Sequence, residues 1–151
     1  MMSPIVMTVV GEIPGHWQPR QNGAFPAPQG FCWRFVPEAN GSVQVRSVLR
    51  LQAEAVVVWV NPGGIRPGDT IERAAKLIER LLATGVQVVI AVNEIHQPDA
   101  EFKLRQAGAL YMCAGEAAAG LGERLHSILR SRSSSHDERD AVPQRLRMDA
   151  G

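Results

Sequence analysis

Histidine and cysteine, the side chains most often used as catalysts or metal ligands, are few in this chain of 151 residues. None of the histidines lies within metal-ligand spacing of another histidine or of a cysteine, so the sequence predicts no zinc or iron site. No two residues have the arrangement of a nucleophile and its base, and we therefore expect that the protein is not an enzyme. The residues considered are His16, His96, His126, His136, Cys32 and Cys113.

Polar residues also follow the apolar runs of the sequence. Glu12, Asn61 and Asn93 come at or just after the ends of such runs, and Gly115 follows the last one. Ligands of open α/β sheets bind outside the carboxyl ends of the strands, where these residues would gather with His96 nearby. They are the candidate ligand-binding residues. The competing interpretation is that Asn61 and Asn93 complete the hydrogen bonds of turns.

The elements that must position these residues are organised around residues 54–93. Two short apolar runs rich in β-branched residues, 55–60 and 87–92, predict strands buried on both faces. Between them, apolar residues recur at helical spacing. Asp69 and Glu72 predict a capping box at the start of that helix, and Gly85 predicts a left-handed residue at its end. The stretch is therefore a β-α-β unit.

Three further apolar runs, at residues 5–10, 31–36 and 109–113, complete the predicted sheet. We expect two short helices, capped by Ser42 and by Asp99, and a last helix over about residues 116–130. The side chains that these helices are expected to bury are Val45, Val48, Leu49, Leu51, Phe102, Leu104, Ala107, Ala118, Leu121, Leu125 and Ile128.

This order of elements predicts a three-layer α/β/α sandwich. Its five-stranded parallel sheet has the flavodoxin-like strand order 2-1-3-4-5, since crossovers between parallel strands are right-handed. Residues 12–30 contain four prolines and three glycines, which exclude a helix. A Pro/Gly-rich loop therefore replaces the first helix of the fold.

Composition limits the class of protein. A hydrophobic share of 45% is ordinary for a globular domain, and a formal net charge of +1 argues against a nucleic-acid partner. We expect one domain over residues 1–130 and a disordered polar tail over residues 131–151. No apolar run approaches the ~18 residues of a membrane span, and no signal peptide is recognisable. The prediction is a cytoplasmic protein with reduced cysteines and no membrane partner.

From Val88 to Leu129, the sequence resembles the second half of a response-regulator receiver domain. A buried strand, a short helix ending before Ala107-Gly108-Ala109, a strand containing Tyr111 and an amphipathic last helix follow in the order of that family. The layout covers roughly residues 4–130. The resemblance implies a domain that accepts a phosphoryl group on an aspartate, beside Mg²⁺ held by acids at two strand ends.

The residues of that switch are replaced here. One acid, Glu12, stands where the family has a pair, and Asn61, which cannot accept a phosphoryl group, stands at the end of the third strand. Val92 or Asn93 occupies the position of the switch Ser/Thr, and Ala114 that of the lysine. The resemblance therefore implies a degenerate receiver, or pseudo-receiver, with no metal and no cofactor. Such a domain acts in signalling by binding a protein partner or by self-association.

A second resemblance gives the alternative function. Residues 93–96 resemble the guanine-reading N-K-x-D strand end of small GTPases, with Glu94 in place of the lysine and His96 in place of the aspartate. No G-x-x-x-x-G-K-[ST] motif is present in the sequence, so a nucleotide hydrolase is not predicted. The alternative is a small-molecule or nucleotide-binding module, flavodoxin-like or degenerate GTPase-like, that uses the carboxyl ends of the strands.

Overall fold

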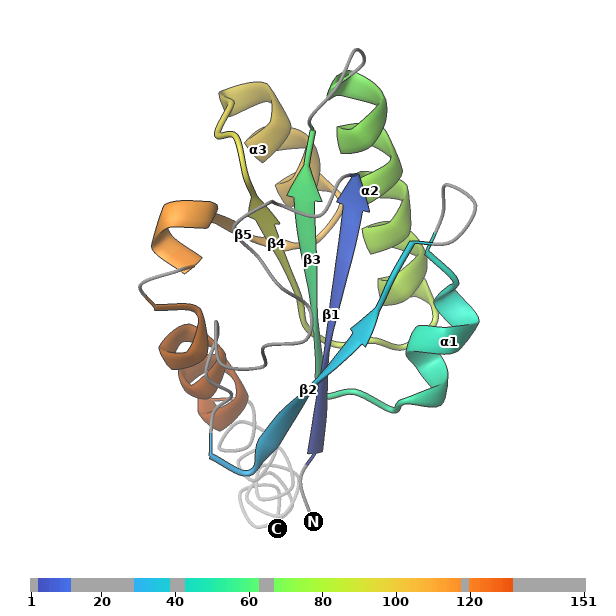
Figure 1. Ribbon diagram of the computed structural model, residues 1–151, viewed down its shortest axis with the longest axis vertical. Coiled ribbons are helices and arrows are strands. Elements are labelled where there is room, and N and C mark those ends of the chain that lie inside the picture. The colour runs from blue at the N-terminus through green and yellow to red at the C-terminus, as the bar shows by residue number, and fades with distance from the viewer. Residues whose placement is uncertain (1–2, 12–28, 39–42, 63–66, 118–119, 132–151) are drawn as a thin grey trace, which may run out of the picture.

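The protein folds around one parallel β-sheet (Figure 1). The computed structural model describes residues 3–11, 29–38, 43–62, 67–117 and 120–131. Within these ranges the sheet has five strands in the order β2-β1-β3-β4-β5, and every neighbouring pair is parallel. The predicted flavodoxin-like α/β fold is therefore confirmed. The strands are β1 (Ser3–Gly11), β2 (Phe31–Val36), β3 (Ala55–Asn61), β4 (Val89–Asn93) and β5 (Leu110–Cys113).

The pattern of buried residues follows the position of each strand in the sheet. β3 and β4 lie in the interior of the sheet, and their apolar runs are buried on both faces, as continuous runs predict. β2 forms an edge, and most of its residues are half-buried. Because successive side chains of a strand point to opposite faces, β3 places Val56, Val58 and Val60 in one core and Val57 and Trp59 in another.

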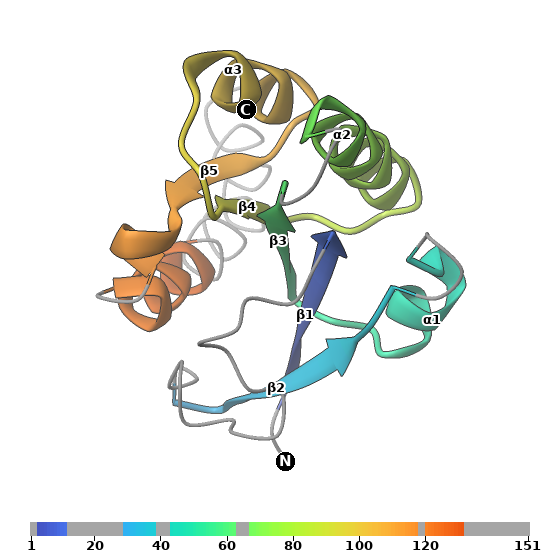
Figure 2. The same cartoon turned by 45° about the horizontal axis from the view of Figure 1, so that its top comes forward.

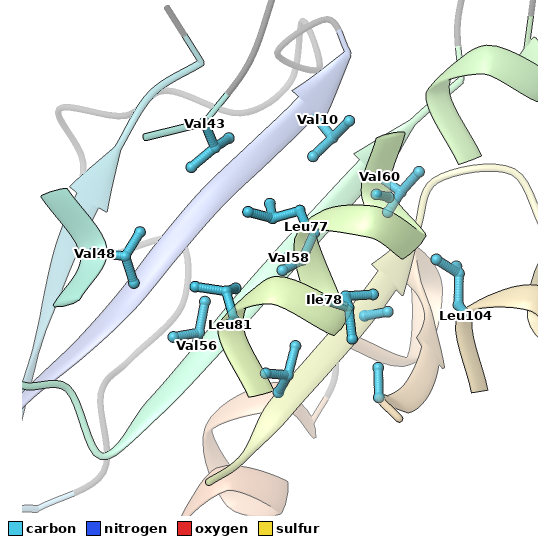
Figure 3. Close-up of a cluster of buried hydrophobic side chains, with 14 of the residues drawn as sticks. Val10, Val43, Val48, Val56, Val58, Val60, Leu77, Ile78, Leu81 and Leu104 are labelled. Carbon is cyan, nitrogen blue, oxygen red and sulfur yellow. The ribbon is translucent and has the colours of Figure 1, made fainter. Parts of the chain in front are cut away.

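Helices cover the two faces unequally (Figures 1 and 2). The helices α1 (Val45–Arg50), α2 (Pro67–Ala83) and α3 (Pro98–Gln106) each contribute buried apolar side chains to the core that contains Val58. Figure 3 shows Leu77 and Leu81 of α2 lying over β3 in this core. The helical residues 114–117 and 120–131 cover the opposite face.

The last helix agrees with its prediction where the structure describes it. Leu121 and Leu125 are fully buried against the second core, and Ile128 is half-buried at its margin. Ala118 lies outside the described residues. The predictions of a Pro/Gly-rich loop and of a polar tail fall on residues 12–28 and 132–151, which are also outside them, so both stay predictions.

The end of α2 was predicted correctly and its beginning was not. The helix ends in a Schellman motif, in which Gly85 N–H donates to the Leu82 carbonyl (3.3 Å) and Val86 N–H donates to the Leu81 carbonyl (3.1 Å). Gly85 has the left-handed φ of +108° that this motif requires. The helix begins at Pro67, so Asp69 lies inside the first turn and the predicted capping box is wrong.

The caps and the buried faces of the short helices also differ from their predictions. Gln97 is the N-cap residue of α3 and Asp99 lies in the first turn, so the cap predicted at Asp99 is wrong. Gln44 precedes α1 with no side-chain capping bond, and Ser42 lies outside the described residues. Leu49 is 37% exposed and Phe102 is 67% exposed. Both were predicted to be buried. Side chains two positions apart in a helix point about 200° apart around its axis. Phe102 therefore cannot share a face with Leu104, which is buried.

Within the described residues, no helix is both long and apolar enough to cross a membrane.

Candidate functional site

The candidate residues at the carboxyl edge of the sheet are positioned by the strand register. Gly11 of β1 pairs with Asn61 of β3, and Asn93 of β4 pairs with Val60. Ala114 and Gly115 directly follow β5, in the helical residues 114–117. The parallel sheet therefore carries Asn61, Asn93, Ala114 and Gly115 to one edge, as expected from parallel strands. Glu12 lies outside the described residues.

The side chain of Asn93 is fully buried and bonded within the protein. Its Nδ2 donates to the Tyr111 hydroxyl oxygen (3.3 Å), and its Oδ1 accepts from the Ile95 N–H (3.3 Å). The second bond closes a turn of the kind that asparagine favours. Asn93 therefore completes the structure of the loop after β4.

Tyr111 connects this asparagine to α3. Its hydroxyl oxygen lies 2.9 Å from His96 Nδ1, within hydrogen-bond distance. The guanidinium carbon of Arg105 lies 5.6 Å from the centroid of the tyrosine ring, the geometry of a cation–π contact. Glu101 accepts from Arg105 Nε (2.8 Å) and lies 3.9 Å from His96 Nε2. This Tyr111 cluster lies at the carboxyl edge on the α3 side of the sheet.

Burial raises the pKa of the Tyr111 hydroxyl, and the hydrogen bond from Asn93 offsets part of this rise. The tyrosine is therefore held in its neutral form, which can both donate and accept a hydrogen bond. The neutral Tyr111 hydroxyl can therefore hydrogen-bond to the Asn93 amide and the His96 imidazole at the same time, which stabilises the structure of this edge.

The opposite face of the same edge is closed by a second interaction. Trp59 Nε1 donates to Glu94 Oε2 (2.8 Å), and Trp59 itself is 1% exposed. The backbone N–H of Glu94 donates to the Val60 carbonyl at 2.8 Å, which fixes the residue beside the end of β3. In the sequence, Glu94 stands out only as a departure from a nucleotide-binding motif. Trp59 does indicate that a partner such as Glu94 is needed, because a tryptophan in a buried strand needs an acceptor for its N–H.

The ends of β1 and β3 approach each other closely. Gly11 has φ of +100°, and a Cβ at this position would lie 2.2 Å from the Asn61 carbonyl oxygen. Only glycine fits there without a shift of the backbone. The Gly11 N–H donates to Glu38 Oε1 (3.3 Å), and the same carboxylate forms an ion pair with Arg73 of α2.

Cys113, at the end of β5, is a half-buried free thiol. Burial raises its pKa, and the neighbouring carboxylate of Glu116 raises it further. Glu116 also accepts from the backbone N–H of Cys113 (3.4 Å). Because the thiolate is the nucleophile, a raised pKa argues against a reactive cysteine at this edge.

Two of the hollows that the described residues line lie beside α2, and the candidate residues line neither of these two. A hollow of about 130 Å³ lies between α2 and α3 and is lined by residues of both helices. A second, of about 160 Å³, lies where α2 passes Glu38 and Val43. Both are smaller than the pockets of about 300–1,000 Å³ that usually hold small-molecule ligands. The first is lined by Gly68, Ile71, Gln97, Asp99, Ala100 and Lys103.

In the part of the chain that the structure describes, no group of three or more His, Cys, Asp or Glu side chains is placed to hold a metal ion. No protein-family model matches the sequence, and no curated protein matches it.

Proposed function

We propose that this protein is a non-catalytic receiver-like domain that acts in signalling through protein–protein interaction. The flavodoxin-like sheet supplies the layout of a receiver domain. At the end of β3, where phosphoryl transfer would need a carboxylate nucleophile, the sequence has the amide Asn61. The proposal includes a cytoplasmic setting, which is supported by two cysteines that are both free.

The observation that carries this proposal is the internal bonding of the carboxyl edge. Asn93 and His96 each lie within hydrogen-bond distance of the Tyr111 hydroxyl, and Glu94 accepts a hydrogen bond from Trp59. A ligand at this edge would have to replace those hydrogen bonds, because a buried polar group left without a partner costs about 1–3 kcal/mol. Binding at this edge is therefore less favourable than binding on an outer surface.

Phosphorylation gives the direct test of the proposal. The purified protein is incubated with acetyl phosphate and Mg²⁺, and its intact mass is measured. We expect the mass to stay unchanged, because Asn61 offers no carboxylate. A stoichiometric acyl-phosphate adduct would contradict the proposal.

A ligand screen tests the alternative, a small-molecule or nucleotide-binding module. The unfolding temperature is measured with nucleotides, flavins and cobalamin. A ligand at about 100 times its dissociation constant stabilises a protein by about 2.7 kcal/mol, which would raise this temperature by several degrees. We expect no rise. A clear rise with one ligand would favour the alternative.

A further inference from the structure

One flank of α2 gathers positive charge beside a hollow in the surface. The hollow, of about 160 Å³, lies where α2 passes the segments that contain Glu38 and Val43. Three cations of the helix line it, namely Arg73, Lys76 and Arg80. Residues three or four positions apart are neighbours on one face of a helix. The three positive side chains therefore form one row, which we call the basic flank of α2.

The protein balances only part of this charge. Glu38 lines the hollow together with the three cations, and both of its carboxylate oxygens have partners. Its Oε1 accepts from the Gly11 N–H (3.3 Å), and its Oε2 pairs with Arg73. Among the described residues, Lys76 and Arg80 form no ion pair. Two positive charges therefore remain at the rim of the hollow.

The spacing of these cations disfavours leaving them without a counter-charge. Like charges four residues apart on a helix repel each other, and Lys76 and Arg80 have this spacing. The exposed acids of the same helix, Glu72 and Glu79, do not line the hollow, and no ion pair joins either of them to a cation among the described residues. Carboxylates of another molecule, bound beside the hollow, would relieve the repulsion.

Apolar side chains provide the floor of the hollow. Val10 of β1, Val43 and Leu77 of α2 line it, and all three are buried (Figure 3). An apolar cavity of about 150 Å³ holds a molecule of benzene in another protein, so this hollow has room for one apolar side chain. It is smaller than the pockets of about 300–1,000 Å³ that hold whole small-molecule ligands.

We infer that this hollow is the docking site for an acidic segment of a partner protein. One aromatic or large aliphatic side chain of the segment fills the hollow, and carboxylates beside it pair with Lys76 and Arg80. An anion with no apolar part would leave the floor in contact with water. An apolar ligand with no charge would leave the two cations unpaired. This inference rests on the proposed function and names the chemistry of the protein partner.

A nucleic acid matches this surface less well. Its affinity comes mainly from many phosphate contacts, whereas Lys76 and Arg80 are the two lining cations that no described acid pairs. Single strands also stack their bases on aromatic side chains, and none of the described residues that line the hollow is aromatic. The charge and the apolar floor together favour a peptide.

A short peptide provides the direct test. The probe is a blocked peptide in which one phenylalanine stands between two pairs of glutamates, and its binding to the full chain is followed by amide chemical shifts. We expect shifts to move at Val10, Val43 and residues 73–80, with a dissociation constant of about 0.1–1 mM, as for a small, transient contact. Replacing the phenylalanine by glycine, or the glutamates by glutamines, should weaken binding about tenfold in each case.

A charge exchange tests the role of the two cations. The double variant Lys76→Glu, Arg80→Glu should bind the acidic peptide at least about tenfold more weakly, because like charges then meet at the rim. A peptide with lysines in place of the glutamates should bind this variant more tightly than it binds the native protein. Recovery with the exchanged peptide cannot arise from a folding defect. The matched control is Arg124→Glu, Arg130→Glu, two exposed cations over the opposite face of the sheet, which should bind the acidic peptide as the native protein does.

Failure of the native protein to bind the acidic peptide at millimolar concentrations would overturn the inference. Equal binding of the peptide without phenylalanine would also overturn it and would mark the hollow as a site for anions alone. Tighter binding of an oligothymidylate at the same residues would assign the surface to a nucleic acid instead. None of these outcomes touches the proposed absence of phosphoryl transfer, which fails through an acyl-phosphate adduct.

Discussion

The carboxyl edge of the sheet and the basic flank of α2 both contain polar side chains, but these side chains have different partners. At the edge, Asn93 and His96 each lie within hydrogen-bond distance of the Tyr111 hydroxyl. On the basic flank, Lys76 and Arg80 form no ion pair within the described residues. The usual ligand-binding edge of this fold thus uses its polar groups for the stability of the protein.

This difference separates two kinds of residue that a sequence alone does not distinguish. Substitutions at the edge should lower the stability of the fold, because buried groups lose partners. Substitutions of Lys76 and Arg80, or of other exposed side chains on the helices, should leave stability nearly unchanged. Each of the following predictions tests one side of that difference.

Trp59→Ala should produce the largest loss of stability. The indole is 1% exposed and packs in the second core, so its removal should cost about 3–5 kcal/mol. Urea unfolding followed by circular dichroism measures this loss. A loss of stability below about 1 kcal/mol would show that the Trp59 side chain does not hold the carboxyl edge together.

Gly11→Ala should cost more than Gly85→Ala. Both glycines have positive φ, which costs other residues about 1–2 kcal/mol. A Cβ at Gly85 meets nothing within 4 Å, whereas one at Gly11 would lie 2.2 Å from the Asn61 carbonyl oxygen. Urea unfolding of both variants makes the comparison. Equal losses would mean that β1 and β3 do not approach closely at the edge.

Asn93→Ala should destabilise the fold by about 1–3 kcal/mol, because it leaves the Ile95 N–H without its partner. Tyr111→Phe removes the other partner of the asparagine. The losses of the two single variants should not add in the double variant, since the residues share one hydrogen bond. Strict additivity would count against the Tyr111 cluster.

Stability should fall as the pH rises above about 9–10. The folded-state pKa values of Cys113 and Tyr111 are raised above the ordinary values of 9.0 and 10.0. As the pH rises, the unfolded chain therefore loses these protons before the folded protein does. The stability that is present at pH values below the ordinary pKa values is lost as the pH rises toward the higher pKa values of the folded protein. Urea midpoints across this range measure the effect. Tyr111→Phe should flatten the upper part of the profile, and an unchanged profile would contradict burial as the cause.

Phe102→Ala should have the smallest effect on stability, within about 0.5 kcal/mol, because the ring is mostly exposed. Urea unfolding measures this change in stability. A large loss of stability would place Phe102 in the core, as the sequence first suggested.

The sheet was predictable because its evidence is local. Continuous apolar runs mark β3 and β4, and Gly85 and Gly108 end α2 and α3 with the positive φ expected of such residues. The short helices were less predictable, since six or nine residues contain too few turns to define a buried face. Phe102 was therefore assigned to the wrong side of α3.

The candidate site was predicted only in part. That Asn93 completes a turn was one of two interpretations of the sequence, and its bond to Ile95 has the geometry of that turn. The contact of Asn93 with Tyr111 joins residues 18 positions apart and depends on the register of β4 and β5. A side-chain bond of this kind is fixed by the packed sheet and leaves no periodic signal in the sequence.

The most direct test of the account is a map of backbone amide chemical shifts recorded as the acidic peptide is added. If the basic flank of α2 is the binding surface and the carboxyl edge is closed, amide shifts should move along residues 73–80, while those of Asn61, Asn93 and Gly115 stay fixed. Shifts that move at the edge while α2 stays unchanged would contradict it.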